Sequence, residues 1–372
     1  MELLNATKMQ AGYTLGMQPD GRELLVVAIK GTFQIPKNGE EPILMEQQEP
    51  LVMADVFSGE PGLSAPIYEC DFVPRKPKCD VLLNGNCYAP GGQPSARVTV
   101  SLQVESVSKS FNVVGDRFWK KRWFFFMGST KPVPFTVMPM SYQRAFGGED
   151  RTHKDQAKHK SFMPNPVGVG FHQQLKSNLI NRKPLPNTEE LSRLVKHPRK
   201  TYRPMAFGPI GRNWDPRPKY AGTYDDAWLE NGFPFLPSDF KDTYYQAAPE
   251  DQQCNYLRGG EQVVLTNVTP TGRTTFRLPT IPMPVVCFPR GGEKKETEAV
   301  IDTLVIEPDR DRFMMVWRSS LPLKKNIFDV VQVVAGVMPK GWYRARELGK
   351  TYYRSLGELV AAKMRERAGQ GV

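Results

Sequence analysis

The sequence predicts a mainly β protein whose body is a sandwich of antiparallel sheets, with long ordered loops and few short helices. First, the chain holds 33 prolines and 31 glycines, scattered without a period. Proline interrupts helices and cannot donate a ladder hydrogen bond, so this spread favours short strands joined by many turns. Second, residues 98–104 read VTVSLQV, with an apolar side chain at every second position, as in a half-buried strand. Third, 40% of the residues are hydrophobic and 24% are charged, which is typical of globular proteins.

Further strands are expected on both sides of this segment. The apolar run at 24–35 is followed by the turn PKNGEE and by residues 43–55, and together they resemble a hairpin. Two more hairpins are expected, at 261–278 around the turn TPTG and at 300–320 around the turn PDRD. The remaining predicted strands are 111–127 and 132–140. Strand pairs near both ends of the chain favour two sheets that close around each other.

Between about residues 141 and 250 the pattern changes to long stretches of proline, glycine and aromatic residues. We expect a loop and helix insertion with defined structure here, because aromatic side chains supply the burial that disordered linkers lack. Two helices are predicted within it. One lies near 172–183, and the other near 188–197, where Thr188 would cap a first turn rich in glutamate.

The chain is expected to divide into a body at 1–320 and a basic extension at 321–372. Within the extension, apolar residues recur every three or four positions from about Arg344 to Arg367, which predicts one amphipathic helix. The apolar stripe consists of Leu348, Tyr352, Leu356, Leu359, Val360 and Met364. An isolated helix of this length is marginal in water. We therefore expect the stripe to pack on the body and to leave the basic face free for an acidic partner.

The formal net charge is +11, and two regions carry it. Residues 151–200 sum to +8 and residues 321–372 to +6, while the rest of the chain sums to −3. Such regions attract anionic partners, including nucleic acid and acidic protein surfaces. The runs WKKRWFFF at 119–126 and RPMAFGPIGRNW at 203–214 interleave cations with aromatic rings, which keeps a nucleic-acid-binding module open as an alternative. Core packing of alternating side chains explains the first run more simply, so nucleic acid is not the expected partner.

We expect a cytoplasmic protein that does not insert into a membrane. The first residues lack the basic start and unbroken apolar core of a secretory signal. Nowhere does an apolar run approach the roughly 20 residues that a membrane-spanning helix needs.

The sequence contains no recognisable catalytic centre, cofactor cradle or metal site. Its five cysteines and four histidines occur at spacings that match no structural zinc site, and no Walker-type glycine loop or nucleophile elbow is present. We therefore expect buried reduced thiols, no cofactor, no metal requirement and no enzyme activity. Carboxylates do gather between residues 225 and 251, which keeps open a hydrolase acting on a cell-wall polymer. They are Asp225, Asp226, Glu230, Asp239, Asp242, Glu250 and Asp251.

An ordered series of motifs runs through most of the chain. It comprises KGTF, EQQEPL, DFVPRKPKCDVLLNG, GDRFW, MPMSYQRAFGGED, NPVGVGF, LPN, FGPIGRNWDPR, AGTYDDAWLENGFPFLPSDF, AAPEDQ and GGEQVVLTNVTPTG. This series, which extends to roughly Pro279, resembles the bacterial family catalogued as domain of unknown function 2169. The resemblance implies a type VI secretion adaptor or chaperone that binds a PAAR-type effector and helps to load it onto the VgrG spike.

The resemblance and the basic tail together suggest a set of partner-binding residues. The motif residues in this set are Arg212, Trp214, Tyr224, Asp225 and Trp228, and the tail contributes Lys350 and Arg354. Many motif residues can instead serve the fold, because Arg and Trp often fix loops by hydrogen bonding and burial. The expected partners are a PAAR-domain effector or spike-tip protein and VgrG itself.

Overall fold

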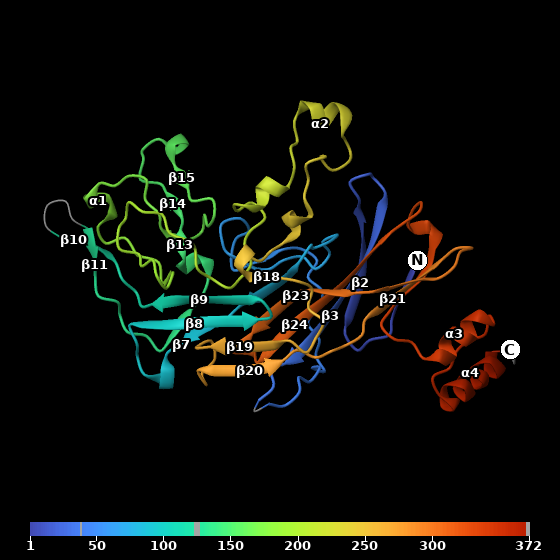
Figure 1. Ribbon diagram of the computed structural model, residues 1–372. Coiled ribbons are helices and arrows are strands. Elements are labelled where there is room, and N and C mark those ends of the chain that lie inside the picture. The colour runs from blue at the N-terminus through green and yellow to red at the C-terminus, as the bar shows by residue number, and fades with distance from the viewer. Residues whose placement is uncertain (38, 123–126, 370–372) are drawn as a thin grey trace.

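A computed structural model describes residues 1–37, 39–122 and 127–369 (Figure 1). The protein is mainly β, as the sequence predicts, with several antiparallel sheets and few short helices. Figure 1 shows the first part of the insertion (green) at one end of the sandwich, its later part (yellow) above the middle and the C-terminal helices (red) at the other end.

One face of the sandwich is a six-stranded sheet of order β18-β6-β23-β24-β3-β2. Its strands are β2 (Gln10–Met17), β3 (Glu23–Gln34), β6 (Cys79–Leu83), β18 (Gln253–Cys254), β23 (Val300–Glu307) and β24 (Arg312–Pro322). β6 and β23 run parallel, and the other neighbours are antiparallel. The longest pairing joins β24 to β3, from Arg312 opposite Gln34 to Pro322 opposite Leu24.

The other face is a five-stranded antiparallel sheet of order β17-β9-β8-β19-β20. Its strands are β8 (Arg97–Val104), β9 (Val107–Val114), β17 (Thr188–Glu189), β19 (Gln262–Thr266) and β20 (Arg273–Arg277). Along β8, Val98, Val100, Leu102 and Val104 are buried, whereas Arg97, Thr99 and Gln103 are exposed. The predicted alternation is therefore confirmed.

The two sheets enclose a single large core. Aromatic rings from both sheets meet in it: Phe276 of β20 lies 5.1 Å from Phe313 of β24, which in turn stacks on Phe33 of β3 at 5.3 Å. Offset aromatic pairs of this kind add to the stabilisation from burial. The inward faces of both sheets contribute to the same cluster, so the fold is a sandwich.

A third sheet extends this core. It has the order β1-β25-β21-β22 and consists of β1 (Glu2–Asn5), β21 (Pro284–Pro289), β22 (Lys295–Glu298) and β25 (Val330–Ala335). β25 lies beyond residue 320, where the sequence analysis ends the body. Its residues Val333 and Ala335 are buried in the main core, so the chain leaves the sheets only after β25.

Short two-stranded sheets also occur outside the three larger sheets. They are β4 (Val56–Phe57) with β5 (Pro66–Tyr68), β7 (Asn86–Tyr88) with β12 (Val137–Pro139), β10 (Trp119–Lys121) with β11 (Met127–Ser129), β13 (Phe146–Gly147) with β16 (Val169–Gly170), and β14 (Glu149–Asp150) with β15 (Lys160–Ser161). The hairpin expected from 24–35 and 43–55 is much shorter than predicted. β3 pairs with the preceding β2 from Glu23 to Lys30. Only the end of β3 meets the later segment, through an antiparallel bridge from Leu44 to Phe33 and backbone hydrogen bonds from the Gln34 amide to the Ile43 carbonyl at 2.9 Å and from the Met45 amide to the Thr32 carbonyl at 3.0 Å.

The insertion contains less helix than its sequence suggests. α1 (Ser177–Ile180) is a single turn within the expected 172–183 segment, and α2 (Asp226–Asn231) lies in a segment where no helix is expected. The helix predicted at 188–197 is wrong, because Thr188 and Glu189 form β17. The buried Glu189 carboxylate accepts hydrogen bonds from Arg117 at 2.7 Å and from Arg97 at 2.8 Å, and these contacts favour the strand over a capped helix.

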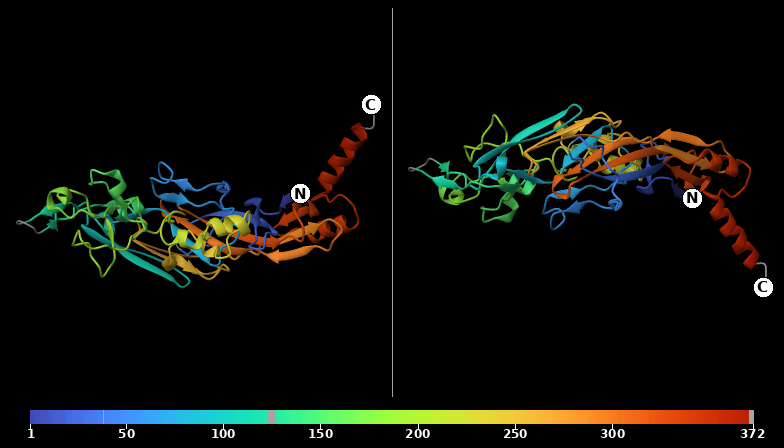
Figure 2. Two further views of the ribbon diagram at one scale, coloured as in Figure 1. Left: turned by 90° about the horizontal axis from the view of Figure 1, so that it is seen from above. Right: turned by 90° about the horizontal axis from the view of Figure 1, so that it is seen from below.

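The tail differs from the single amphipathic helix that the sequence predicts. It forms two helices, α3 (Lys340–Glu347) and α4 (Leu356–Gly369), separated by a break at Gly349, whose φ is +64°. Figure 2 shows α4 projecting away from the body. Leu356 is 76% exposed and Met364 is 67% exposed, so the expectation that the apolar stripe packs on the body is wrong. Among the described residues, no helix is long and apolar enough to cross a membrane.

Candidate functional site

The most prominent projection of the body is the loop at 222–240, which carries α2 (Figure 1). We call it the α2 loop. Asp239 holds the two ends of the loop together. The Asp239 carboxylate accepts hydrogen bonds from the Thr223 amide at 2.9 Å and from the Thr223 hydroxyl at 2.8 Å. These hydrogen bonds lower the pKa of Asp239, so the ionised form holds the loop closed. Gly222 turns the chain at the entrance with a φ of +84°, a conformation that favours glycine.

An internal scaffold orders the α2 loop. The Asp225 side chain caps α2 by accepting a hydrogen bond from the Trp228 amide at 2.9 Å. The Trp228 indole donates to the Phe235 carbonyl at 2.9 Å, so it ties the helix to the segment of the loop that returns to the body. The same indole packs edge-on between Tyr224, at 4.8 Å, and Phe233, at 5.8 Å. Asp225 and Trp228 are therefore supports of the loop as well as part of its surface.

Four apolar or aromatic side chains of the α2 loop are exposed, beside the exposed carboxylates of Asp226 and Glu230. Tyr224 is 55% exposed, Leu229 60%, Phe233 64% and Phe235 44%, and we call these four residues the loop patch. Single exposed hydrophobic residues are normal on any protein, whereas a group of them on one projecting element is typical of interaction sites. The loop patch is therefore a candidate interaction surface.

The base of the loop rests on buried and half-buried ion pairs. Arg212 binds Asp55 through two hydrogen bonds of 2.8 and 3.1 Å and lies 3.2 Å from Glu69. Burial would lower the pKa of Arg212, but the two carboxylates outweigh it and raise that pKa. Arg217 also binds Glu69 and donates to the Ile210 carbonyl at 2.9 Å. Arg212 therefore acts first as a structural support.

Trp214 does not present a binding surface. Its side chain is 1% exposed and packs edge-on against Tyr142 with ring centroids 5.3 Å apart. A partner that left the body unchanged would not reach it. The partner-binding assignment of Trp214 is therefore not compatible with this structure, and the residue instead packs in a small core with Tyr142 and Ile210.

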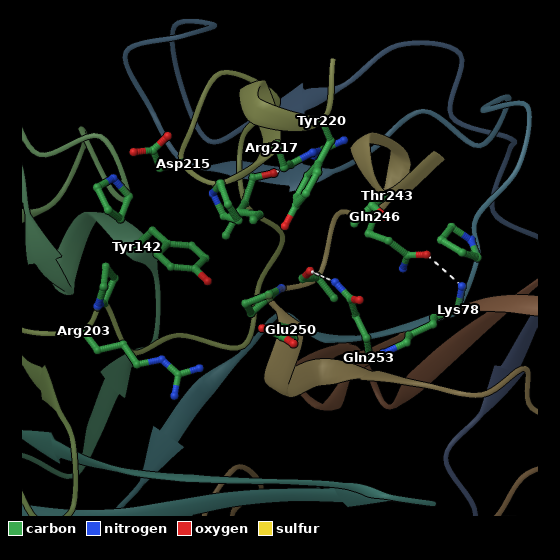
Figure 3. Close-up of a pocket in the computed structure, with 17 residues that line it drawn as sticks. Lys78, Tyr142, Arg203, Asp215, Arg217, Tyr220, Thr243, Gln246, Glu250 and Gln253 are labelled. Atoms are coloured by element: carbon green, nitrogen blue, oxygen red, sulfur yellow. Dashed lines mark hydrogen bonds between the residues drawn. The ribbon is translucent and has the colours of Figure 1, made fainter. Parts of the chain in front are cut away.

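A cavity of about 450 Å³ lies near the root of the α2 loop (Figure 3). Tyr220 lines it from the loop side, and Gln253 lines it from the sandwich side. Two of the polar side chains around it have partners within the protein. Arg203 pairs with Asp251 at 2.8 Å, and Gln253 donates to the Ala248 carbonyl at 2.8 Å. The cavity is therefore a hollow between insertion and sandwich in which these polar groups are already satisfied.

Four of the seven carboxylates on which the hydrolase alternative rests have structural partners. Asp225 and Asp239 hold the α2 loop, as described above. Asp242 pairs with Arg75 at 3.1 Å, and Asp251 binds both Lys109 and Arg203. Burial lowers the pKa of Lys109 to about 8, although Asp251 opposes this effect. These four carboxylates therefore have structural roles in the fold.

The tail residues lie far from this loop. Lys350 and Arg354 are exposed in the link between α3 and α4, at the end of the molecule that carries the C-terminus (Figure 1). The structure thus brings Tyr224, Asp225 and Trp228 together, and places the two tail residues on a separate surface. Leu229, Phe233 and Phe235 are not among the residues predicted from the sequence, although the segment GFPFLP places aromatic residues between glycine and prolines.

Metal ligands and reactive thiols are the remaining candidates for a chemical site. Within the described ranges, no three His, Cys, Asp or Glu side chains gather as a metal site. Cys79, Cys87, Cys254 and Cys287 are buried free thiols and Cys70 is half-buried. Of the run at 119–126, Trp119 is buried and Lys120 and Lys121 are exposed, whereas residues 123–126 lie outside the described residues.

Fold and loop together define a β-sandwich protein with a large loop insertion and a projecting apolar surface. Residues 20–318 match the family described as "Uncharacterized protein conserved in bacteria (DUF2169)", and the chain belongs to this family. The match continues past Pro279, where the motif series ends, and reaches into β24. Comparisons with curated proteins and with solved structures found no match.

Proposed function

We propose that the protein is a non-enzymatic type VI secretion adaptor or chaperone. In this role it binds a PAAR-type effector and helps to load it onto the VgrG spike. Membership of the family supports the proposal, because the motif series that implies this role lies within the matched residues. The family is bacterial, which agrees with a role in type VI secretion.

The loop patch is the observation that carries the proposal. Binding energy in protein interfaces concentrates in a few large side chains, with aromatic residues prominent among them. Tyr224, Phe233 and Phe235 are such residues, and they project on a loop that Asp225, Trp228 and Asp239 hold in place. A preordered loop loses little conformational entropy on binding, which favours affinity. The geometry therefore suits a protein-binding role.

The test compares the loop patch with a matched surface. The double variant Leu229→Ser and Phe233→Ser removes two residues that are 60% and 64% exposed. We expect it to lower recovery of PAAR-type and VgrG proteins with the tagged protein by about tenfold or more, because hot-spot residues dominate affinity. Recovery is measured by quantitative mass spectrometry after purification from the native bacterium.

The control removes equally exposed apolar side chains elsewhere. Ile43 and Leu63 are each 64% exposed, and the double variant Ile43→Ser and Leu63→Ser should bind as the unmodified protein does. The proposal is wrong if the unmodified protein enriches no spike-tip or effector protein, or if both double variants reduce recovery equally.

The hydrolase alternative has a separate test. Asp225→Asn keeps a side chain that can still cap α2, because asparagine is as good a helix cap as aspartate. We expect this variant, alone or with Asp226→Asn, to retain effector loading. A stable variant that instead loses a measurable hydrolysis of cell-wall polymer would establish the enzyme.

A further inference from the structure

A second surface, at the end of the sandwich opposite the insertion, has a different chemistry. A hollow of about 530 Å³ lies between the turn joining β21 to β22 and the segment joining β24 to β25. We call it the basic groove. Its charged lining residues are Arg290, Glu293, Lys294, Lys295, Lys324, Lys325 and Asp329. Five of these are cations and two are anions, so the groove has a net positive charge.

Most of these cations are not neutralised within the protein. Among the described residues, Arg290, Lys295, Lys324 and Lys325 form no ion pair, whereas Lys294 lies 3.7 Å from Glu296. All five cations are exposed. Cations that face a shared hollow repel one another, and an anionic ligand relieves that repulsion. The groove therefore favours an anionic occupant.

The walls of the groove are fixed to the sheet. The Arg290 amide donates to the Asp329 carbonyl at 2.6 Å, which joins one wall to the other. The Ile327 amide donates to the Glu23 carboxylate at 2.9 Å, which anchors the second wall to β3. Buried Cys287 and Val330 form part of the lining at the sheet. The cations thus stand on a framework that exists before any ligand binds.

Aromatic rings near the groove bear on whether its anionic ligand is a nucleic acid or an acidic segment of a protein. Lys294 lies over the Tyr343 ring at 5.1 Å, and Arg346 lies over the Phe288 ring at 4.0 Å. Since cations cover these rings, they are not free to stack with bases, as sites for single-stranded nucleic acid require. Phe328, which is 80% exposed beside the groove, is an uncovered ring, but a single ring does not provide the succession of stacking surfaces on which the bases of a single strand lie. This combination fits carboxylates accompanied by an apolar residue.

We propose that the basic groove binds an acidic segment of a partner protein that also carries an apolar residue. Carboxylates of the segment would lie against Lys295, Lys324 and Lys325, and its apolar residue would pack on Phe328. Flexible lysines suit a run of carboxylates, because each acts as a point charge without the planar geometry that arginine imposes. The proposal depends on the proposed function only in taking the partner to be a protein.

The experiment measures binding of a fluorescent synthetic peptide of about ten residues, rich in glutamate and containing one leucine. Anisotropy titrations use the full chain and the double variant Lys324→Glu and Lys325→Glu. Both side chains are exposed, so the fold should be retained. We expect saturable binding that weakens as salt screens the charges. The variant should bind about tenfold more weakly or worse, because it replaces attraction with repulsion.

The control carries the same change in net charge at another place. Lys154 and Lys200 are exposed lysines of the insertion, and the double variant Lys154→Glu and Lys200→Glu should change the affinity by less than about twofold, as rim charges remote from a site do. Phe328→Ser should weaken binding of the leucine-containing peptide and leave a peptide without leucine unaffected.

Three results would overturn the proposal: no saturable peptide binding, an equal loss in the control variant, or displacement of the peptide by a thymidine decanucleotide at lower concentration. The last would assign the groove to nucleic acid. Recovery of effector proteins through the loop patch is a separate measurement, so failure of the groove and failure of the proposed function can be told apart.

Discussion

At the scale of single residues, Asp150 shows how one buried carboxylate organises a loop. It accepts hydrogen bonds from the Thr152 amide and hydroxyl at 2.9 and 2.5 Å, and from the amides of Gln173 and Gln174 at 2.7 and 2.8 Å. Burial by itself would raise the pKa of Asp150, but these hydrogen bonds outweigh it and hold that pKa to about 2. The ionised carboxylate therefore joins two segments of the insertion.

We expect Asp150→Asn to lower the free energy of unfolding by about 1–3 kcal/mol at neutral pH, because buried donors lose a charged acceptor. A lowered pKa stabilises the folded state above the unfolded pKa of about 4, and this contribution is lost as the pH falls towards 2. The difference between the two proteins should therefore shrink below about pH 4. Urea denaturation at several pH values measures it. Glu149→Gln, which loses only the contact to exposed Arg151, should change stability by less than about 1 kcal/mol.

At the scale of elements, the two tail helices differ in their attachment. α3 lies against β21 and β25, where Arg346 stacks on Phe288 and also binds Gln332. α4 has no such anchor among the contacts described, and Leu356 and Met364 on it are exposed. Lys350 and Arg354, between the helices, remain predicted contacts for an acidic partner. The first helix therefore belongs to the body, and the second is free to meet another molecule.

Deletion of residues 350–372 should change the melting temperature by less than about 2 °C, since α4 buries little. Deletion of 340–372 should cost about 1 kcal/mol or more, because it also removes the cation–π contact of Arg346. Differential scanning calorimetry of both truncated proteins measures these changes. A large loss from the shorter deletion would mean that α4 packs on the body in solution.

At the scale of the whole molecule, buried charges join the insertion to the sandwich. Asp80 of β6 is fully buried and accepts hydrogen bonds from Gln246, at 2.6 Å, and from the amides of Ala247 and Ala248. It also pairs with Lys76 at 2.7 Å. The segment that returns from the α2 loop is thus fixed to the central sheet, so the position of the loop patch depends on this carboxylate.

Asp80→Asn should lower the free energy of unfolding by about 3–5 kcal/mol, because it removes the nearer of the two carboxylates that pair with the buried Lys76 and also weakens the hydrogen bonds to residues 246–248. Hydrogen exchange should rise first around residues 246–248, where the hydrogen bonds are weakened. Glu296→Gln breaks a pair in which both side chains are more than half exposed, and it should cost less than about 1 kcal/mol. Equal effects of the two changes would contradict the role given to Asp80.

The hairpins β19–β20 and β23–β24 could be predicted because the residues that determine them lie close together in the sequence. In each, apolar residues recur near a turn whose chemistry suits the bend: Gly272 has a φ of +80° and Asp311 a φ of +53°. The wrong predictions concern segments whose partners are remote in sequence. The local sequence predicts Glu189 in the first turn of a helix. Arg117 and Arg97, which are remote in sequence, bind its carboxylate and favour a strand instead. Residues 43–55 resemble the second strand of a hairpin, but β2 pairs with β3 from Glu23 to Lys30, so that only the end of β3 is left for them.

The sequence by itself determined the fold class, the buried face of β8, the family and the segment that holds the candidate site. Only the tertiary structure decided which aromatic residues of that segment and its neighbours reach the surface. Trp214 and Phe233 both lie among glycines and prolines, yet Trp214 packs beneath Tyr142 while Phe233 stands exposed on the α2 loop. Local patterns set the spacing of apolar side chains, whereas their exposure depends on which distant segments fold across them.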